Sequence, residues 1–161
     1  MRPLPIVWDP GYSPAFPANH RFPMAKFGHL KDWVDAHVPH TELYRPTPCP
    51  IEVVSAVHAP DYVEGFQAGT LDARAFREIG LPWSEGLAAR TILALGGSLL
   101  TCQLALESGL ASHLAGGTHH AHHARGSGFC IYNDLAVCAR YLTGEGLASR
   151  GLIFDCGVHQ G

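Results

Sequence analysis

Four residues in two short motifs could carry out chemistry in this sequence. His119 and His120 follow two glycines in the run Gly-Gly-Thr-His-His-Ala, and Asp155 and His159 form an Asp-x-x-x-His further along. Neighbouring side chains of an extended segment point in opposite directions, but a loop opened by glycine lets both imidazoles turn toward one pocket. Imidazole nitrogens and carboxylate oxygens are groups that a catalytic Zn²⁺ accepts. The two motifs therefore indicate a metal-assisted hydrolytic site.

Each of these residues also has an ordinary structural explanation. A lone histidine is more often structural than functional, and His122 and His123 extend the run to His-His-x-His-His, which can bind a divalent metal at a surface. Asp155 alone fits a strand-end cap, and His159 alone fits a loop histidine. A histidine pair placed directly after two glycines favours the functional interpretation.

A glycine-rich run lies between the two motifs. Gly128 and Phe129 belong to the sequence Gly-Ser-Gly-Phe, in which the glycines permit an unusual backbone and the phenyl ring suits the wall of a narrow apolar pocket. A plain surface loop with one core phenylalanine explains the same run equally well.

The composition is that of a globular protein. The chain has 161 residues, of which 47% are hydrophobic and 16% charged, and this length predicts one domain. A net charge of -3 gives no basic surface for nucleic acid or membrane lipid. The five cysteines are odd in number and never spaced Cys-x-x-Cys, which favours reduced thiols in a cytoplasmic protein. We see no signal peptide and no apolar stretch that approaches the roughly 20 residues of a membrane span.

Apolar runs and helical periodicity predict the elements that position the motifs. The predicted strands are 4–8, 110–115 and 151–154, and the predicted helices are 24–37, 51–58, 61–67, 84–108 and 131–142. The order strand, helix, strand after residue 110 predicts a crossover unit, so we expect an open parallel sheet flanked by helices. Ligands of such sheets bind outside the carboxyl ends of the strands, where both histidine-bearing motifs fall.

The sequence resembles the histone deacetylase and acetylpolyamine amidohydrolase superfamily, and within it the bacterial proteins similar to class IV members. The resemblance covers essentially the whole chain and rests on Gly-Gly-Thr-His-His-Ala, on Gly-Phe-Cys-Ile-Tyr-Asn-Asp, and on the runs 20–24, 57–63 and 79–84. It implies an arginase/deacetylase-like α/β fold and hydrolysis of an N-acetyl amide, either acetyl-lysine or an acetylated amine. Family members are roughly double this length, so residues 1–161 are expected to be the N-terminal part of such a domain, truncated near its middle.

The resemblance also implies roles for individual residues. It makes His120 the general base toward a metal-bound water and His119 its electrostatic partner or proton carrier. Asp155 matches a carboxylate that orients His119 and takes part in a monovalent-cation site, and His159 matches a zinc ligand. Gly157 stands where the family has an aspartate ligand, and glycine offers a metal no side chain.

The substrate channel is the other part of the matched site. Phe129, with Gly128 before it, matches a wall of the acyl-lysine tunnel, and Arg21 lies near the matching inner channel. The family's later Asp ligand and an oxyanion-stabilising Tyr have no counterpart up to Gly161. With one of three protein ligands left, we expect the chain alone to bind zinc poorly, to be inactive, and to self-associate through an exposed sheet edge.

Two other classes of function stay open at this point. One is a non-catalytic module that binds an acylated ligand or a partner through the retained pocket. The other is a histidine-rich metal-binding protein that uses residues 119–123. A later Asp-rich ligand loop in a continuing reading frame would favour the enzyme over both.

Overall fold

The computed structural model describes residues 2–159 and divides the chain into two compact units. The first unit comprises Met1–Pro50 and Trp83–Gly116, and the second comprises Ile51–Pro82 and Gly117–Gly161. The assignment of residues 1–161 to one domain stays a prediction.

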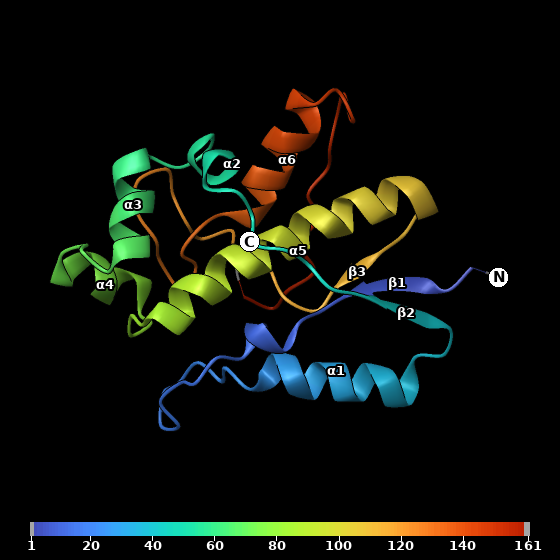
Figure 1. Cartoon of the computed structure of the whole chain (residues 1–161), viewed down its shortest axis with the longest axis horizontal. Coiled ribbons are helices and arrows are strands. Elements are labelled where there is room, and N and C mark those ends of the chain that lie inside the picture. The colour runs from blue at the N-terminus through green and yellow to red at the C-terminus, as the bar shows by residue number, and fades with distance from the viewer. Residues whose placement is uncertain (1, 160–161) are drawn as a thin grey trace. The chain divides into compact units, whose positions relative to one another are not determined.

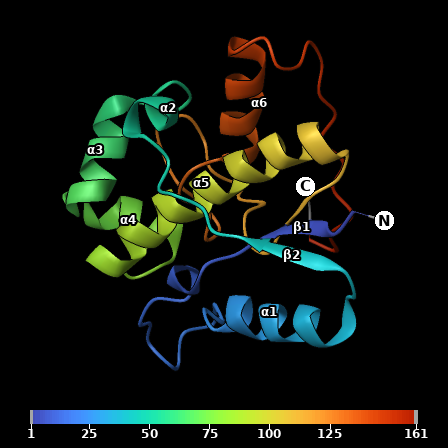
Figure 2. The same ribbon diagram turned by 45° about the vertical axis from the view of Figure 1, so that its right-hand side comes forward.

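A parallel sheet forms the centre of the first unit. β1 (Leu4–Val7) lies between β2 (Thr41–Tyr44) and β3 (Ser112–His113), with Leu4 opposite Thr41 and Ile6 opposite Ser112. Parallel neighbours need long crossover connections, which here contain α1 (Lys26–His37) and α5 (Glu85–Ser108). The two helices lie on opposite sides of the strands (Figures 1 and 2). The predicted α/β class, a parallel sheet flanked by helices, is confirmed.

Helix α5 has the boundaries that its end residues predict. The Ser84 hydroxyl accepts a hydrogen bond from the Leu87 amide at 3.1 Å, which is the ordinary N-cap arrangement. Gly109 ends the helix in the left-handed region at φ 87° and donates its amide to the Ala105 carbonyl. An added Cβ at Gly96 would lie 1.9 Å from the Thr47 carbonyl oxygen, so close packing explains a glycine in mid-helix.

The same helix corrects the expectation about membrane spans. Within residues 2–159, α5 is long and apolar enough to cross a membrane by length and mean hydropathy alone. Of its most apolar window, 56% is buried inside the protein, and the core helix of a soluble protein passes the same test. The statement that no apolar stretch approaches the length of a span is therefore wrong by this measure.

The second unit is helical and holds an aromatic core. Its helices are α2 (Ile51–Ser55), α3 (Pro60–Ala68), α4 (Ala73–Ile79) and α6 (Asp134–Gly144). The Tyr132 ring lies 5.7 Å from that of Phe66 and 5.9 Å from that of Tyr62, in edge-on geometry that aromatic pairs favour. The Tyr62 hydroxyl donates to the Ile131 carbonyl at 2.8 Å, so the core also anchors the segment that leads into α6.

The predicted strand 151–154 is wrong. Residues 151–157 have no regular secondary structure, and the side chains of Leu152 and Phe154 are 90% and 81% exposed. A strand exists only when a neighbour takes up its backbone hydrogen bonds, and among the described residues the sheet contains β1, β2 and β3 alone. The predicted crossover unit after residue 110 is therefore not completed.

Candidate active site

The four residues of the two motifs come together in the second unit. His119 Nδ1 lies 3.8 Å from Asp155 Oδ2, and His120 Nε2 lies 3.2 Å from His159 Nδ1. The rings of His119 and His120 are 4.2 Å apart between centroids. The sequence prediction that both motifs converge on one site agrees with this geometry.

The surroundings of His120 favour its neutral form. Desolvation lowers the pKa of His120, and the charges that His119 and His159 would carry lower it further, while Asp155 acts in the opposite direction. A general base must be unprotonated at the working pH, so this shift suits His120 for accepting a proton.

The loop in front of the histidine pair is fixed by a buried carboxylate. Asp134 is 3% exposed and accepts hydrogen bonds from the amides of Gly117 at 3.0 Å and Thr118 at 2.7 Å. The Thr118 hydroxyl lies 2.9 Å from the same carboxylate. Asp134 therefore sets the backbone immediately before His119.

The neighbouring Asn133 fixes the other side of the same loop. Its Oδ1 caps α6 by accepting from the Ala136 amide at 3.0 Å. Its Nδ2 donates to the carbonyls of His119 at 3.2 Å and Ala121 at 3.3 Å, on either side of His120. Sequence reasoning gave Asn133 and Asp134 no role, although an Asn-Asp pair before a helix is a recognisable cap signal.

The glycine-rich run borders His120 as a strained turn. Gly128 and Phe129 both have positive φ, 55° and 68°, and an added Cβ on Gly128 would touch the His120 side chain at 3.7 Å. A phenylalanine in this region costs roughly 1–3 kcal/mol unless its surroundings hold it there. The Phe129 amide donates to the Ile79 carbonyl at 2.8 Å, which is one such restraint. Gly128 of the predicted tunnel wall therefore lies next to His120, while the contact of this wall with a substrate stays a prediction.

A cavity of about 430 Å³ opens beside His119. It combines the polar side chains of His119 and Asp155 with apolar side chains of α6 and of the segment after residue 151. The lining residues are Gly117, His119, Leu135, Leu152, Ile153, Phe154, Asp155 and Cys156. A cavity of this character suits a short apolar group attached to a polar one.

The described residues do not fit a catalytic zinc ion. Across residues 2–159 there is no group of three or more His, Cys, Asp and Glu side chains that could hold a metal. At Gly157, where the resemblance implies an aspartate ligand, the backbone amide donates to Asp155 Oδ1 at 2.7 Å. His159 is the one ligand that the resemblance implies among these residues, whereas a catalytic zinc site uses three protein ligands. The monovalent-cation site near Asp155 stays a prediction.

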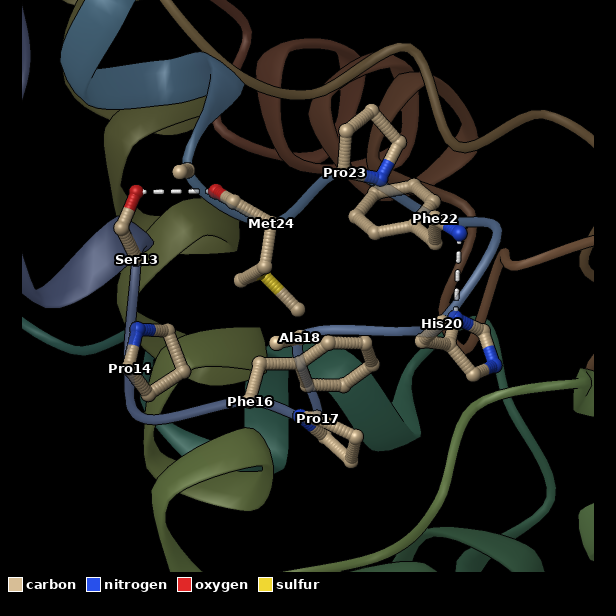
Figure 3. Close-up of a pocket in the computed structure, with 10 residues that line it drawn as sticks. Ser13, Pro14, Phe16, Pro17, Ala18, His20, Phe22, Pro23 and Met24 are labelled. Atoms are coloured by element: carbon tan, nitrogen blue, oxygen red, sulfur yellow. Dashed lines mark hydrogen bonds between the residues drawn. The ribbon is translucent and has the colours of Figure 1, made fainter.

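Arg21 belongs to the first unit, in an exposed position. The loop around it encloses a separate cavity of about 340 Å³ that Arg21 does not line. Figure 3 shows the Met24 side chain reaching into this space above the Phe16 ring, with the Ser13 hydroxyl donating to the Met24 carbonyl at 2.9 Å. The role of Arg21 in an inner channel stays a prediction.

Comparison with known proteins gives one consistent result. Residues 20–161 match the histone deacetylase domain. An uncharacterized protein of Picosynechococcus sp. is 49% identical over 160 residues, which cover 98% of this chain and 53% of that protein. The acetoin utilization protein AcuC of Bacillus subtilis is 36% identical over 121 residues, 68% of this chain and 31% of AcuC.

A solved structure of an HDAC homolog complexed with SAHA has the same fold, with a TM-score of 0.69 at 24% identity over 91% of this chain and 42% of that one. The chain thus spans about half the length of the first relative and less of the other two proteins. The histidine pair, the Gly-Phe run and the Asp-x-x-x-His motif all fall inside the matched range, and the chain belongs to the histone deacetylase domain family.

Proposed function

We propose that this chain supplies the paired histidines, His119 and His120, of an amidohydrolase site that removes acetyl groups from acetyl-lysine or an acetylated amine. The observation that carries the proposal is the convergence of His119, His120, Asp155 and His159 in one unit, with the pKa of His120 lowered. The family match supports the reaction class, and the cavity of about 430 Å³ beside His119 supports an acyl group as the part that is bound.

In this proposal His120 Nε2 takes a proton from the attacking water. The water oxygen forms a bond to the acetyl carbon, the carbon–nitrogen bond breaks, and the proton passes to the leaving amine. His119, beside the Asp155 carboxylate, carries positive charge or a proton during this transfer. The products are acetate and the free amine.

Zinc dependence is proposed for a complete site and not for residues 1–161 alone. A zinc ion lowers the pKa of its bound water toward about 7, but the described chain offers it one matched ligand, His159. We therefore expect the isolated chain to release no acetate from acetyl-lysine peptides even with added Zn²⁺. Zinc-dependent turnover by homogeneous 161-residue protein, abolished by His120→Ala, would overturn this expectation.

A second candidate is a module that binds an acylated ligand without hydrolysing it. The incomplete metal site, together with the cavity that His119 shares with Leu135 and Phe154, favours it. Residues 1–161 carrying Gly157→Asp and fused to the unmatched part of the Picosynechococcus relative separate the two candidates, because only the enzyme should then release acetate from an acetyl-lysine peptide. Saturable NMR shifts of the His119 ring without acetate release by this fusion support the binding module, and the unacetylated peptide is the matched control.

A further inference from the structure

His58 is a buried histidine that the two motifs do not include. It follows α2 and is 1% exposed. Its Nδ1 lies 2.9 Å from the His122 carbonyl oxygen and 3.2 Å from that of His123, and its Nε2 lies 2.9 Å from the Asn133 amide nitrogen. Both ring nitrogens therefore contact backbone groups at the two ends of the segment 122–133.

These partners determine where the ring proton sits. A backbone carbonyl only accepts a hydrogen bond and a backbone amide only donates one, so Nδ1 carries the proton and Nε2 accepts from Asn133. A proton on Nε2 would face the Asn133 amide, donor against donor. Burial also lowers the pKa of His58, although its hydrogen bonds to the His122 and His123 carbonyls act in the opposite direction. His58 is therefore neutral, and one tautomer satisfies all its contacts.

The contacts of His58 lead to the histidine pair in one further step. His58 fixes the backbone of Asn133, and the Asn133 side chain holds the carbonyls of His119 and Ala121, on either side of His120. At the other end, His58 holds the carbonyls of His122 and His123. The loop that carries His119 and His120 is thus held from both sides through one imidazole.

Filling the core does not by itself require a histidine here. The His58 ring packs against the rings of Tyr132 at 5.3 Å and Tyr62 at 6.1 Å, surroundings that a phenyl ring also suits. A buried polar ring is costly unless its nitrogens are hydrogen-bonded. Both ring nitrogens of His58 are hydrogen-bonded to backbone groups of residues 122, 123 and 133. A phenylalanine would leave these backbone groups without that partner.

We propose that His58 is a positioning residue that sets the loop geometry of His119 and His120 through one fixed tautomer. The proposal rests on the proposed function in that it takes this pair as the reacting groups. The geometry itself can be tested without turnover, so a failure of either proposal can be recognised separately.

The first experiment determines which ring nitrogen of His58 carries the proton in the full chain. Nitrogen NMR of the labelled protein distinguishes a protonated from an unprotonated ring nitrogen. We expect the His58 proton on Nδ1 and an unprotonated Nε2 at pH 7. A proton on Nε2, or rapid averaging between the two tautomers, would overturn the proposal whatever the variants do.

Three variants then separate positioning from packing. His58→Phe removes the hydrogen bonds of both ring nitrogens, His58→Asn keeps a donor at the place of Nδ1, and His58→Gln keeps an acceptor near the place of Nε2. We expect amide exchange at Thr118, His122 and Asn133 to rise about tenfold in His58→Phe, since a lost buried hydrogen bond changes an equilibrium by about that factor. His58→Asn should restore protection at His122, and His58→Gln should restore it at Asn133.

Tyr62→Phe is the matched control, because it removes one buried hydrogen bond, to Ile131, in the same unit. It should leave exchange at Thr118 and His122 as in the wild type. If His58→Phe does the same, or if Tyr62→Phe loosens the loop equally, His58 is a core residue and nothing more. In an active fusion of residues 1–161, carrying Gly157→Asp, to the unmatched part of the Picosynechococcus relative, His58→Phe should lower kcat about tenfold or more with KM unchanged.

Discussion

The two halves of the candidate site differ in how the fold supports them. The loop with His119 and His120 is held by two buried side chains, Asp134 and His58, through hydrogen bonds of 2.7–3.2 Å to backbone groups. The segment with Asp155 and His159 is exposed throughout and, over residues 151–159, contains neither helix nor strand. The half with His119 and His120 is thus organised by buried hydrogen bonds, whereas the half with Asp155 and His159 lies exposed to solvent.

The largest expected effect lies in the exposed half, at Gly157. Residues 1–161 can be fused to the part of the Picosynechococcus relative that lies outside its matched region, since the match covers 53% of that protein. We expect acetate release from an acetyl-lysine peptide by the fusion with Gly157→Asp and none by the fusion with Gly157, because glycine offers a metal no ligand.

The intact relative, assayed in parallel, is the control for the fusion, and His120→Ala should abolish any activity gained. Gly157→Asp in the 161-residue chain should restore nothing, since the described residues then still lack a third ligand. Equal activity of the two fusions would show that Gly157 does not stand at a ligand position.

The same chemical change should have unequal effects in the two halves. Asp134→Asn replaces one of the two carboxylate oxygens that accept from the amides of Gly117 and Thr118, and we expect it to lower the free energy of unfolding by about 1–3 kcal/mol. Asp155→Asn changes an exposed carboxylate, and we expect no measurable loss. Urea unfolding of both variants tests this contrast, and equal losses would contradict it.

Self-association is expected to arise in the exposed half. The predicted sheet edge at 151–154 does not exist, but Leu152 and Phe154 are exposed apolar side chains on the same segment. Exposed apolar patches favour association. Sedimentation at micromolar concentration should show oligomers of the wild-type chain and a shift toward monomer in the double variant Leu152→Ser, Phe154→Ser. A compact wild-type monomer would refute this prediction.

The smallest expected effect is a pH dependence that comes from the organised half. Burial lowers the pKa of His58 below its ordinary value of about 6.5. Below about pH 6.5, His58 therefore binds more protons in the unfolded chain than in the folded one. The stability that neutral His58 contributes is complete above that pH and is lost as the pH falls, by at most about 1.4 kcal/mol per unit.

The comparison of wild type with His58→Phe isolates this contribution. Urea unfolding at pH 7.5 and pH 5.5 should give a smaller difference for His58→Phe than for the wild type. Both proteins are compared in a His120→Ala background, which removes the contribution of the lowered pKa of His120. Parallel pH dependences would show that His58 is not held neutral.

Sequence patterns predicted the parts of the molecule that depend on local interactions. The N-cap Ser84 and the left-handed Gly109 define α5, and the apolar run at 4–7 forms β1. Helix α4 (Ala73–Ile79) and strand β2 (Thr41–Tyr44) were missed because neither has an apolar periodicity that stands out. The run 151–154 has the composition of a strand, but pairing with a neighbour decides whether a strand forms.

The candidate site divides in the same way. Motif spacing was enough to bring together His119, His120, Asp155 and His159, because each carries a group with recognisable chemistry. His58 was not found, since its partners are backbone groups between residues 122 and 133 that no spacing rule connects to it. Hydrogen bonds to a distant backbone leave no signal in side-chain types.

The close approach of α5 to its neighbours restricts which sequences this fold can accept. An added Cβ at Gly97 would lie 2.1 Å from the Tyr12 hydroxyl and 2.4 Å from His113 Nε2, and the clash at Gly96 involves a backbone carbonyl that no rotamer change can move. In a library that randomises α5 one codon at a time, positions 96 and 97 should therefore return glycine alone. The exposed positions of the same helix, Leu106 among them, should accept most amino acids.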